Sequence, residues 1–329
     1  MKIDIKKILS EYTPIVEKEI KKIIQKNKKP FEAYGLIWDL LDRGGKRFRP
    51  AMCIISCEAV GGKAKYALPA AAGIEMLHNA TLLHDDIEDN SDERRGKGCI
   101  HKIYGVPLAI NAGDVLYFSA YLPLVKLKSE KAREILAKSF AEIGEGQAYD
   151  IGWVEKEKWD ISEKGYTDMV AKKTGALIGA SCSAGAYIGG ATEKTARILY
   201  NYGKAIGAAF QIQDDVLNLI GDVKKYGKEI GGDISEGKRT LIIINTLQNA
   251  SKKDRNNLIK ILSSHTKNKK KIIEAIDIIK RYDGIDYALD YANKLVKKAK
   301  QDLKRAKLKK NKSTEILFAF PDFFINREF

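Results

Sequence analysis

The sequence of 329 residues has few cysteines, prolines and tryptophans: four, seven and three, respectively. The cysteines, Cys53, Cys57, Cys99 and Cys182, show neither a disulfide spacing nor the paired Cys/His spacing of a zinc site. We therefore expect reduced thiols in a cytoplasmic protein. Because 44% of the residues are hydrophobic and 31% are charged, the composition excludes a disordered or collagen-like chain.

Long apolar runs are also lacking. The first residues mix Lys and Glu with isolated Ile, which is unlike a signal peptide. Residues 174–192 carry no charge, but Gly, Ala and Ser dominate them, and this composition favours a closely packed buried helix over a membrane span. We expect a soluble protein with no transmembrane segment and at most peripheral contact with a membrane.

Negative charge is in deficit, and 58 Lys and Arg against 43 Asp and Glu give a net charge of +15. Residues 251–312 alone contribute +13. Such a basic region could bind nucleic acid or an anionic membrane, but a solvated helical surface explains it more simply. Its only aromatic residues are Tyr282, Tyr287 and Tyr291, so we do not expect nucleic-acid binding.

The alternation of apolar and polar residues that is typical of strands is scarce, and helical periodicity dominates. Residues 1–30 form an amphipathic helical segment. The same spacing recurs in 31–42, 66–84, 111–127, 131–149, 194–219 and 272–307. Since linkers, repeats and strand–helix alternation are lacking, we expect one all-α domain over 1–329, although the length alone suggests two.

Three segments interrupt the predicted helices. Arg43-Gly44-Gly45-Lys46 ends one helix, with glycines suited to a C-terminal cap. Residues 90–107 form a polar connection. Residues 221–239 are long for a loop and rich in Gly and Lys, which predicts a lid over something anionic.

Two acidic clusters lie within otherwise apolar helices. Asp85 and Asp89 are one turn apart at a helix end, where carboxylates repel each other and oppose the helix dipole. Asp214 and Asp215 lie in a second helix. A solvated helix end would explain the first cluster alone. Two inward clusters are costly to bury unless they face each other across cations such as Mg²⁺.

Basic residues accompany these acids. They are Lys46, Arg49, Arg94, Arg95, Lys172, Lys173, Lys228 and Lys238. Metal-binding acids surrounded by phosphate-binding cations predict diphosphate chemistry in a central cavity. The sequence has no Walker-type glycine loop, so transfer of a phosphoryl group from a nucleotide is not expected.

Five motifs in order, GGKRFRP, EMLHNATLLHDDIEDNSDERRG, KKTG, FQIQDDVLNL and GKEIGGDISEGKRT, resemble the trans-isoprenyl diphosphate synthases, most closely the geranylgeranyl diphosphate synthases of archaeal and eukaryotic type. The resemblance covers roughly residues 35–240. It implies a helical bundle of the isoprenoid synthase type, a single polyprenyl synthase domain and a homodimer. The implied substrates are isopentenyl diphosphate and an allylic diphosphate, namely the dimethylallyl, geranyl or farnesyl ester.

The resemblance also implies roles for individual residues. Those that would hold the diphosphate of isopentenyl diphosphate are Lys46, Arg49, His78 and Arg95. Asp85 and Asp89 would bind two Mg²⁺ and Asp214 a third. The residues that would contact the allylic diphosphate are Arg94, Lys173, Lys228 and Lys238, whereas Thr174 and Gln211 would face the nascent cation. Asn218 stands where the family usually has a third aspartate, so we assign no metal to it.

The implied reaction begins when the allylic C–O bond ionises with help from Mg²⁺ and the cations. The double bond of isopentenyl diphosphate attacks the carbocation, and a proton is lost to the released pyrophosphate. Closure of residues 221–239 would exclude water.

The product length depends on what fills the pocket below the acids. Thr81 and Ala80 lie one turn below Asp85 and are small, so the prenyl tail should pass them. Tyr117 and Phe118 are candidates for the floor, although ordinary core aromatics would look the same. We expect a product of twenty carbons, with a longer chain as the main alternative. A non-catalytic regulatory subunit and a terpene cyclase are further alternatives, which the intact motifs disfavour.

Overall fold

The computed structural model describes residues 3–220 and 231–325. Helices make up nearly all the regular structure of these residues. The strands are β1 (Glu93–Arg94) and β2 (Lys97–Gly98), which pair as a short antiparallel hairpin. The all-α prediction is confirmed.

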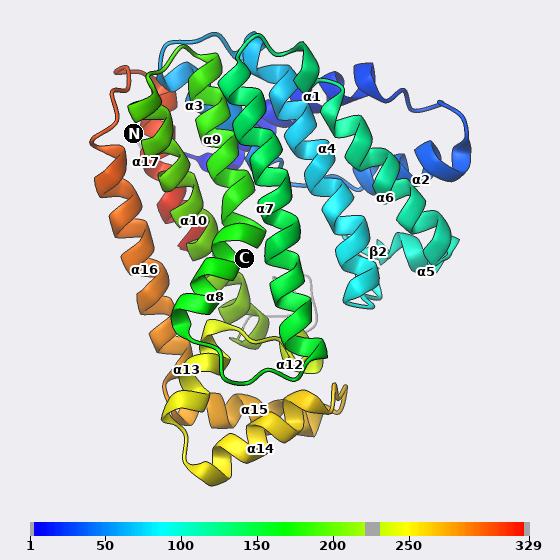
Figure 1. Cartoon of the computed structure of the whole chain (residues 1–329), viewed down its shortest axis with the longest axis vertical. Coiled ribbons are helices and arrows are strands. Elements are labelled where there is room, and N and C mark those ends of the chain that lie inside the picture. Colours follow the sequence, from blue (N-terminus) through cyan, green and yellow to red (C-terminus); the bar gives the residue numbers. More distant parts are fainter. Residues whose placement is uncertain (1–2, 221–230, 326–329) are drawn as a thin grey trace. The chain divides into compact units, whose positions relative to one another are not determined.

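The described chain divides into two compact units, whose helices and strands are labelled in Figure 1 where there is room. Unit 1 holds the residues up to Phe140, Leu177–Gly203 and Asp302–Phe320, and unit 2 holds Ala141–Ala176, the described part of Lys204–Gln301 and the residues from Pro321 on. The prediction of one domain over 1–329 stays a prediction.

Unit 1 contains these elements: α1 (Ile5–Ile23), α2 (Phe31–Asp42), α3 (Phe48–Ala59), α4 (Ala64–Glu88), β1, β2, α5 (Ile100–Tyr104), α6 (Val106–Tyr121) and the 3₁₀ turn η1 (Leu124–Lys126). Unit 2 contains α8 (Glu163–Val170), the π-helical turn η2 (Ala171–Gly175), α12 (Gly232–Ser235), α13 (Leu241–Asn249), α14 (Lys252–Ser263) and α15 (Lys269–Arg281). The division falls within α7 (Glu130–Glu155), α9 (Ala176–Ile188), α10 (Glu193–Ile220), α16 (Gly284–Leu303) and α17 (Lys312–Ile325).

In unit 1, the long helix α4 packs closely against α6, as Figure 1 shows. Glycine makes this approach possible at two places. A side chain at Gly73 would collide with the backbone carbonyl of Ala120, and one at Gly113 would collide with the His84 ring. The acidic end of α4 therefore lies beside α6.

The uncharged stretch 174–192 contains α9, most of whose apolar side chains are buried. A Cβ atom at Gly185 would overlap the carbonyl of Cys53 in α3, so only glycine permits this contact. The prediction of a closely packed buried helix is confirmed. A different described segment, Val106–Lys126, is long enough and apolar enough to span a membrane. Its mean hydropathy is 1.3, and 44% of its most apolar 18-residue stretch is buried. A core helix passes the same test, so this is weak evidence for a span.

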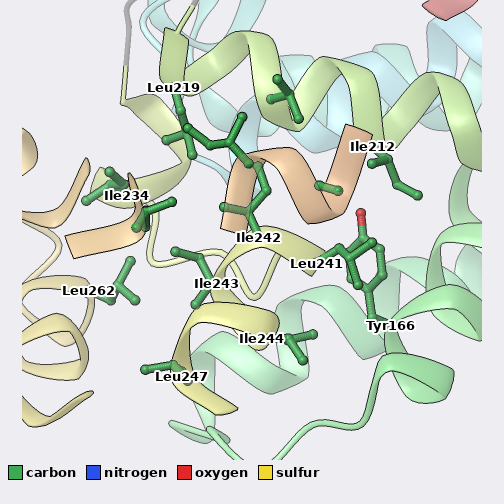
Figure 2. Packing of buried hydrophobic residues seen from close by; sticks show 14 of the residues in the cluster. Tyr166, Ile212, Leu219, Ile234, Leu241, Ile242, Ile243, Ile244, Leu247 and Leu262 are labelled. Carbon is green, nitrogen blue, oxygen red and sulfur yellow. The ribbon is translucent and has the colours of Figure 1, made fainter. Parts of the chain in front are cut away.

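The core of unit 2 centres on α13, which α8, α10 and α12 surround. Figure 2 shows Leu241, Ile242 and Ile243 of α13 among side chains from these neighbours. Tyr166 of α8 is buried in the same cluster, and in Figure 2 its hydroxyl points toward the helix that carries Ile212. This core supports the helix with the second acidic cluster.

The predicted helices differ from the observed ones in several places. In the predicted segment 1–30 the helix α1 ends at Ile23, and α7 continues to Glu155, past the predicted end at 149. The segment 272–307 is two helices, α15 and α16, because Asp283 adopts a left-handed backbone with φ of 54°. The segment 111–127 ends earlier, at Tyr121, and Pro123 precedes the short turn η1. The polar connection 90–107 contains the β-hairpin and α5. By contrast, α2 matches its predicted bounds, and Gly44 follows it with a left-handed φ of 80°.

Candidate active site

The turn after α2 brings several cations together in unit 1. Arg47 adopts a left-handed φ of 45°, and its buried guanidinium forms an ion pair of 2.5 Å with Glu75 of α4. Asn79 also donates to Glu75, at 2.6 Å. Because Arg47 anchors the start of α3, it positions Lys46 and Arg49 on either side of it. Arg47 was not predicted as a functional residue, and its role is structural.

His78 of α4 accepts a hydrogen bond of 3.0 Å from Arg49. Burial lowers the pKa of His78 well below its usual value, and the charges of Arg49 and Arg95 lower it further. The imidazole is therefore neutral at pH 7. Two cations lie beside a neutral acceptor here, and this cluster is well suited to an anion.

The β-hairpin docks against the end of α2 and delivers two more cations. Arg43 donates hydrogen bonds to the carbonyls of Arg94 and Gly98, at 3.2 and 2.9 Å. Arg95 donates to the carbonyl of Leu40 at 3.3 Å. The structure thus joins the GGKRFRP motif to residues that are about fifty positions away, as the sequence analysis predicted for Arg49, His78 and Arg95.

Arg95 differs from its neighbours in its counter-ions. The partners of Arg43 and Arg94 are Asp39 and Asp86, respectively. Arg95 has no carboxylate within ion-pair distance among the residues that the structure describes. Burial lowers the pKa of Arg95 to about 10, and the charge of Arg47 acts in the same direction. A bound anion would relieve the repulsion among these guanidinium groups.

The acidic end of α4 places its aspartates in two environments. Asp86 is 1% exposed and accepts hydrogen bonds from Arg94. Asp85 and Asp89 are half-buried, and the Asp89 amide bonds the Asp85 carbonyl at 2.8 Å, one helical turn back. Within the described ranges, no group of three His, Cys, Asp or Glu residues forms a ready-made metal site. Mg²⁺ needs only one or two protein carboxylates when phosphates complete its shell, so Asp85 and Asp89 fit it.

The predicted chain-length residues lie around the same helix end. Ala80 is fully buried, and the Thr81 hydroxyl donates to the His78 carbonyl at 2.8 Å. The ring of Tyr117 lies 5.3 Å from that of His84, and the nearby charge of Asp85 adds to burial in raising the pKa of Tyr117. Phe118 is 74% exposed, so it is not a core aromatic of this chain. Its place in the pocket floor stays a prediction.

In unit 2, the second acidic cluster also pairs a buried, hydrogen-bonded aspartate with a half-buried one. Asp214 is half-buried, whereas Asp215 is buried and accepts hydrogen bonds from Tyr166 at 2.7 Å and from Gln211 at 2.9 Å. Burial raises the pKa of Asp215 to about 7, against the opposing effect of these hydrogen bonds. Gln211 also accepts a hydrogen bond of 3.0 Å from Thr174. The structure thus brings the two predicted cation-facing residues together.

Lys173 lies in η2, a π-helical turn of the kind often found at functional sites. It forms an ion pair of 2.5 Å with Asp150 of α7. A Cβ atom at Gly146 would overlap the backbone nitrogen of Lys173, so glycine allows η2 to approach α7. The sequence analysis missed Asp150 and Gly146. Their position one turn apart on a single helix was the available signal.

Asn218 holds the described end of the predicted lid. Its side-chain oxygen accepts a hydrogen bond of 3.0 Å from the Asp233 amide, and its carbonyl accepts one of 2.7 Å from Gly231. Lys238 forms an ion pair with Glu236, at 2.5 Å. Lys228 lies outside the described residues, as do residues 221–230 of the predicted lid. Asn218 therefore has a positioning contact that the sequence analysis did not predict.

Comparison with known proteins decides the family. The sequence model of the polyprenyl synthetase family matches residues 32–279. The chain belongs to this family. It is 40% identical over 325 residues to the short chain isoprenyl diphosphate synthase of Methanothermobacter thermautotrophicus, with 98% of each chain covered.

Other members of the polyprenyl synthetase family differ in the product that they are named for. The chain is 39% identical to the geranylgeranyl diphosphate synthase of Sulfolobus acidocaldarius, and the match covers 89% of this chain and 90% of the relative. It is 34% identical to the geranylfarnesyl diphosphate synthase of Aeropyrum pernix, with coverages of 91% and 95%.

Solved structures of family members agree with the fold. The geranylgeranyl pyrophosphate synthetase from Pyrococcus horikoshii Ot3 has a TM-score of 0.90 and 37% identity, and the match covers 98% of this chain and 99% of that one. A polyprenyl synthase from Caulobacter crescentus CB15, complexed with calcium and isoprenyl diphosphate, has a TM-score of 0.90 and 29% identity, with 98% of each chain covered. The chain is thus an isoprenyl diphosphate synthase with the all-α isoprenoid synthase fold, from a family that uses divalent metal.

Proposed function

We propose that the enzyme condenses isopentenyl diphosphate with allylic diphosphates, head to tail, and releases mainly geranylgeranyl diphosphate. The observation that carries the proposal is the cation cluster of unit 1, in which Arg49 and Arg95 surround a neutral His78 and Arg95 has no carboxylate partner among the described residues. This cluster concentrates positive charge and guanidinium donors, which are the groups that bind a diphosphate.

Each group of residues has one task in this proposal. Lys46, Arg49, His78 and Arg95 hold isopentenyl diphosphate. Arg94, Lys173 and Lys238, together with Lys228, bind the allylic diphosphate and stabilise the charge that develops as the C–O bond breaks. The isopentenyl double bond supplies the electron pair of the new C–C bond, and a proton leaves to the released pyrophosphate. Thr174 and Gln211 place oxygens toward the carbocation.

Asp85, Asp89 and Asp214 would hold Mg²⁺, for which three ions per active site are proposed. When bound, the metal neutralises the charge on the leaving diphosphate. The half-buried position of Asp85 and Asp89, one turn apart, supports this assignment. A related polyprenyl synthase was solved with calcium, which prefers the same oxygen ligands.

Small residues on α4 support a product of twenty carbons. Ala80 and Thr81, about one turn below Asp85, are small, so the prenyl tail is proposed to extend past them. The likeness to a geranylfarnesyl diphosphate synthase keeps a longer product as the second candidate.

We also propose a homodimer in the cytoplasm. An exposed apolar face on α5, α6 and η1 supports self-association, and its members are Ile103, Val106, Ile110, Phe118, Leu122 and Val125. The four cysteines are free and buried, as expected for a reducing compartment. Light scattering should give a mass twice that of the 36.7 kDa chain. A monomer at micromolar concentration would contradict the dimer.

Incubation with labelled isopentenyl diphosphate, each allylic primer in turn and Mg²⁺, followed by chromatography of the dephosphorylated alcohols, tests the function. We expect a twenty-carbon alcohol from every primer and no incorporation when EDTA replaces Mg²⁺. Incorporation without any primer, or none with all primers, would contradict the proposal. A product of twenty-five carbons or more would select the second candidate.

A further inference from the structure

We propose that Tyr166 and Asp215 are positioning residues that set the orientation of Gln211 and Thr174 and so decide which atoms these two side chains present to the allylic cation. The inference rests on the proposed function, because it assigns a physical basis to the cation-facing oxygens. Its starting point is a continuous series of hydrogen bonds within unit 2, from α8 through α10 to η2.

The first step is the fixed direction of Asp215. Tyr166 and Asp215 are 1% and 6% exposed, and the phenol donates to one carboxylate oxygen at 2.7 Å. The other oxygen accepts from Gln211 at 2.9 Å. Both oxygens of Asp215 are thus engaged by protein donors that come from different helices, and the carboxylate has one buried orientation.

The second step is the orientation of the Gln211 amide. Both oxygens of Asp215 accept hydrogen bonds in the structure, so the NH₂ end of the Gln211 amide faces Asp215. With the NH₂ end toward Asp215, the Gln211 oxygen must lie on the opposite side. There it meets the Thr174 hydroxyl at 3.0 Å.

The third step is the direction of the Thr174 hydroxyl. The Gln211 oxygen can only accept, so Thr174 must donate its single proton to it. The remaining surface of the Thr174 oxygen then carries lone pairs and no proton. Lone pairs stabilise an adjacent positive charge, whereas a hydroxyl proton would oppose it. Without Asp215 and Tyr166, the amide could flip and the hydroxyl could rotate.

The test begins with Tyr166→Phe, which removes one oxygen and keeps the ring in the core. We expect kcat for condensation to fall roughly tenfold, the value of about one buried hydrogen bond, while KM for isopentenyl diphosphate stays unchanged. The share of allylic diphosphate that is hydrolysed to alcohol instead of elongated should rise. Tyr202→Phe is the matched control, because Tyr202 is equally buried and donates to the carbonyl of Leu317 in unit 1.

The decisive measurement is a double-mutant cycle with Gln211→Leu, which has no amide to orient. Tyr166→Phe should lower kcat in the wild-type background and should have no further effect in the Gln211→Leu background. Thr174→Ser retains the hydroxyl and should retain most of kcat, whereas Thr174→Val should not.

An unchanged kcat in Tyr166→Phe, or an equal loss in both backgrounds, would overturn the inference. So would a loss of kcat in Tyr202→Phe as large as that in Tyr166→Phe. A wild-type enzyme without elongation activity would instead refute the proposed function, so the two failures are distinguishable.

Discussion

Asp86, the middle acid of the first aspartate cluster, forms its ion pair with Arg94, which lies eight residues further along the chain. The carboxylate is 1% exposed, and the guanidinium belongs to the β-hairpin. Because of this contact, neighbouring acids in the cluster have different roles. Asp86 fixes a cation that is proposed to bind the allylic diphosphate, while Asp85 and Asp89 are proposed to bind metal.

Asp86→Asn should therefore weaken both folding and substrate binding. Removing the charge of a buried pair costs ~3 kcal/mol of unfolding free energy and releases Arg94 from its fixed position. We expect KM for the allylic diphosphate to rise by roughly tenfold, the value of ~1.4 kcal/mol. Urea unfolding and initial-rate kinetics check the two effects. An allylic KM unchanged from wild type would show that Asp86 does not position Arg94.

Asp85→Ala should lower turnover by orders of magnitude, because a proposed metal ligand is lost where the leaving group develops its charge. The unfolding free energy should change little, since Asp85 is only half-buried. Steady-state turnover at several Mg²⁺ concentrations is the measurement. Turnover close to wild type would count against the assigned site.

Ala80→Phe should shorten the product, because the larger ring would fill space one turn below Asp85. Phe31→Ser serves as its control, since Phe31 is 57% exposed and belongs neither to the proposed pocket nor to the proposed dimer face. Chromatography of the dephosphorylated products distinguishes them. An unchanged product from Ala80→Phe would remove this face of α4 from the chain-length pocket.

Asn218→Ala should lower kcat, because it removes the acceptor for the Asp233 amide and loosens the start of α12. Asn218→Asp keeps an acceptor oxygen at the same place and should retain activity. Kinetics of both variants as a function of Mg²⁺ separate the two roles. A marked gain in Mg²⁺ affinity in Asn218→Asp would indicate a metal site at position 218 instead.

Stability should fall as the pH rises above 9. Burial raises the pKa of Cys57 to about 11 and that of Cys182 to about 12, so the folded chain keeps these protons after the unfolded chain has released them. The unfolded state then gains ~1.4 kcal/mol per pH unit for each thiol between pH 9 and 11. Urea unfolding at pH 8, 9 and 10 should show this slope, and Cys182→Ala should reduce it. Equal slopes in the two proteins would contradict the role of the buried thiol.

Local features of the sequence predicted the helices and the chemistry of the site. The bounds of α2 and the glycine after it follow from apolar spacing and from the left-handed backbone that glycine adopts freely. The association of Arg49, His78 and Arg95 was predicted from motifs. In the structure Arg49 contacts His78, and the hairpin that docks on α2 brings Arg95 to the same place. The break at Asp283 was not predicted, because the apolar pattern continues across it.

Only the tertiary structure revealed the partners that hold the functional groups. Tyr166 is 49 positions from Asp215, Asp150 is 23 from Lys173, and Asn218 reaches the Asp233 amide 15 positions away. None of these pairs has a short sequence spacing from which the contact could have been predicted.

The sequence by itself determined where helices form and which residues carry charge, because these depend on near neighbours and on side-chain chemistry. Packing decided which aspartate of each acidic cluster turns inward, namely Asp86 in the first and Asp215 in the second. The inward acids, Asp86 and Asp215, accept hydrogen bonds from other elements, since a buried carboxylate without a donor is too costly to keep.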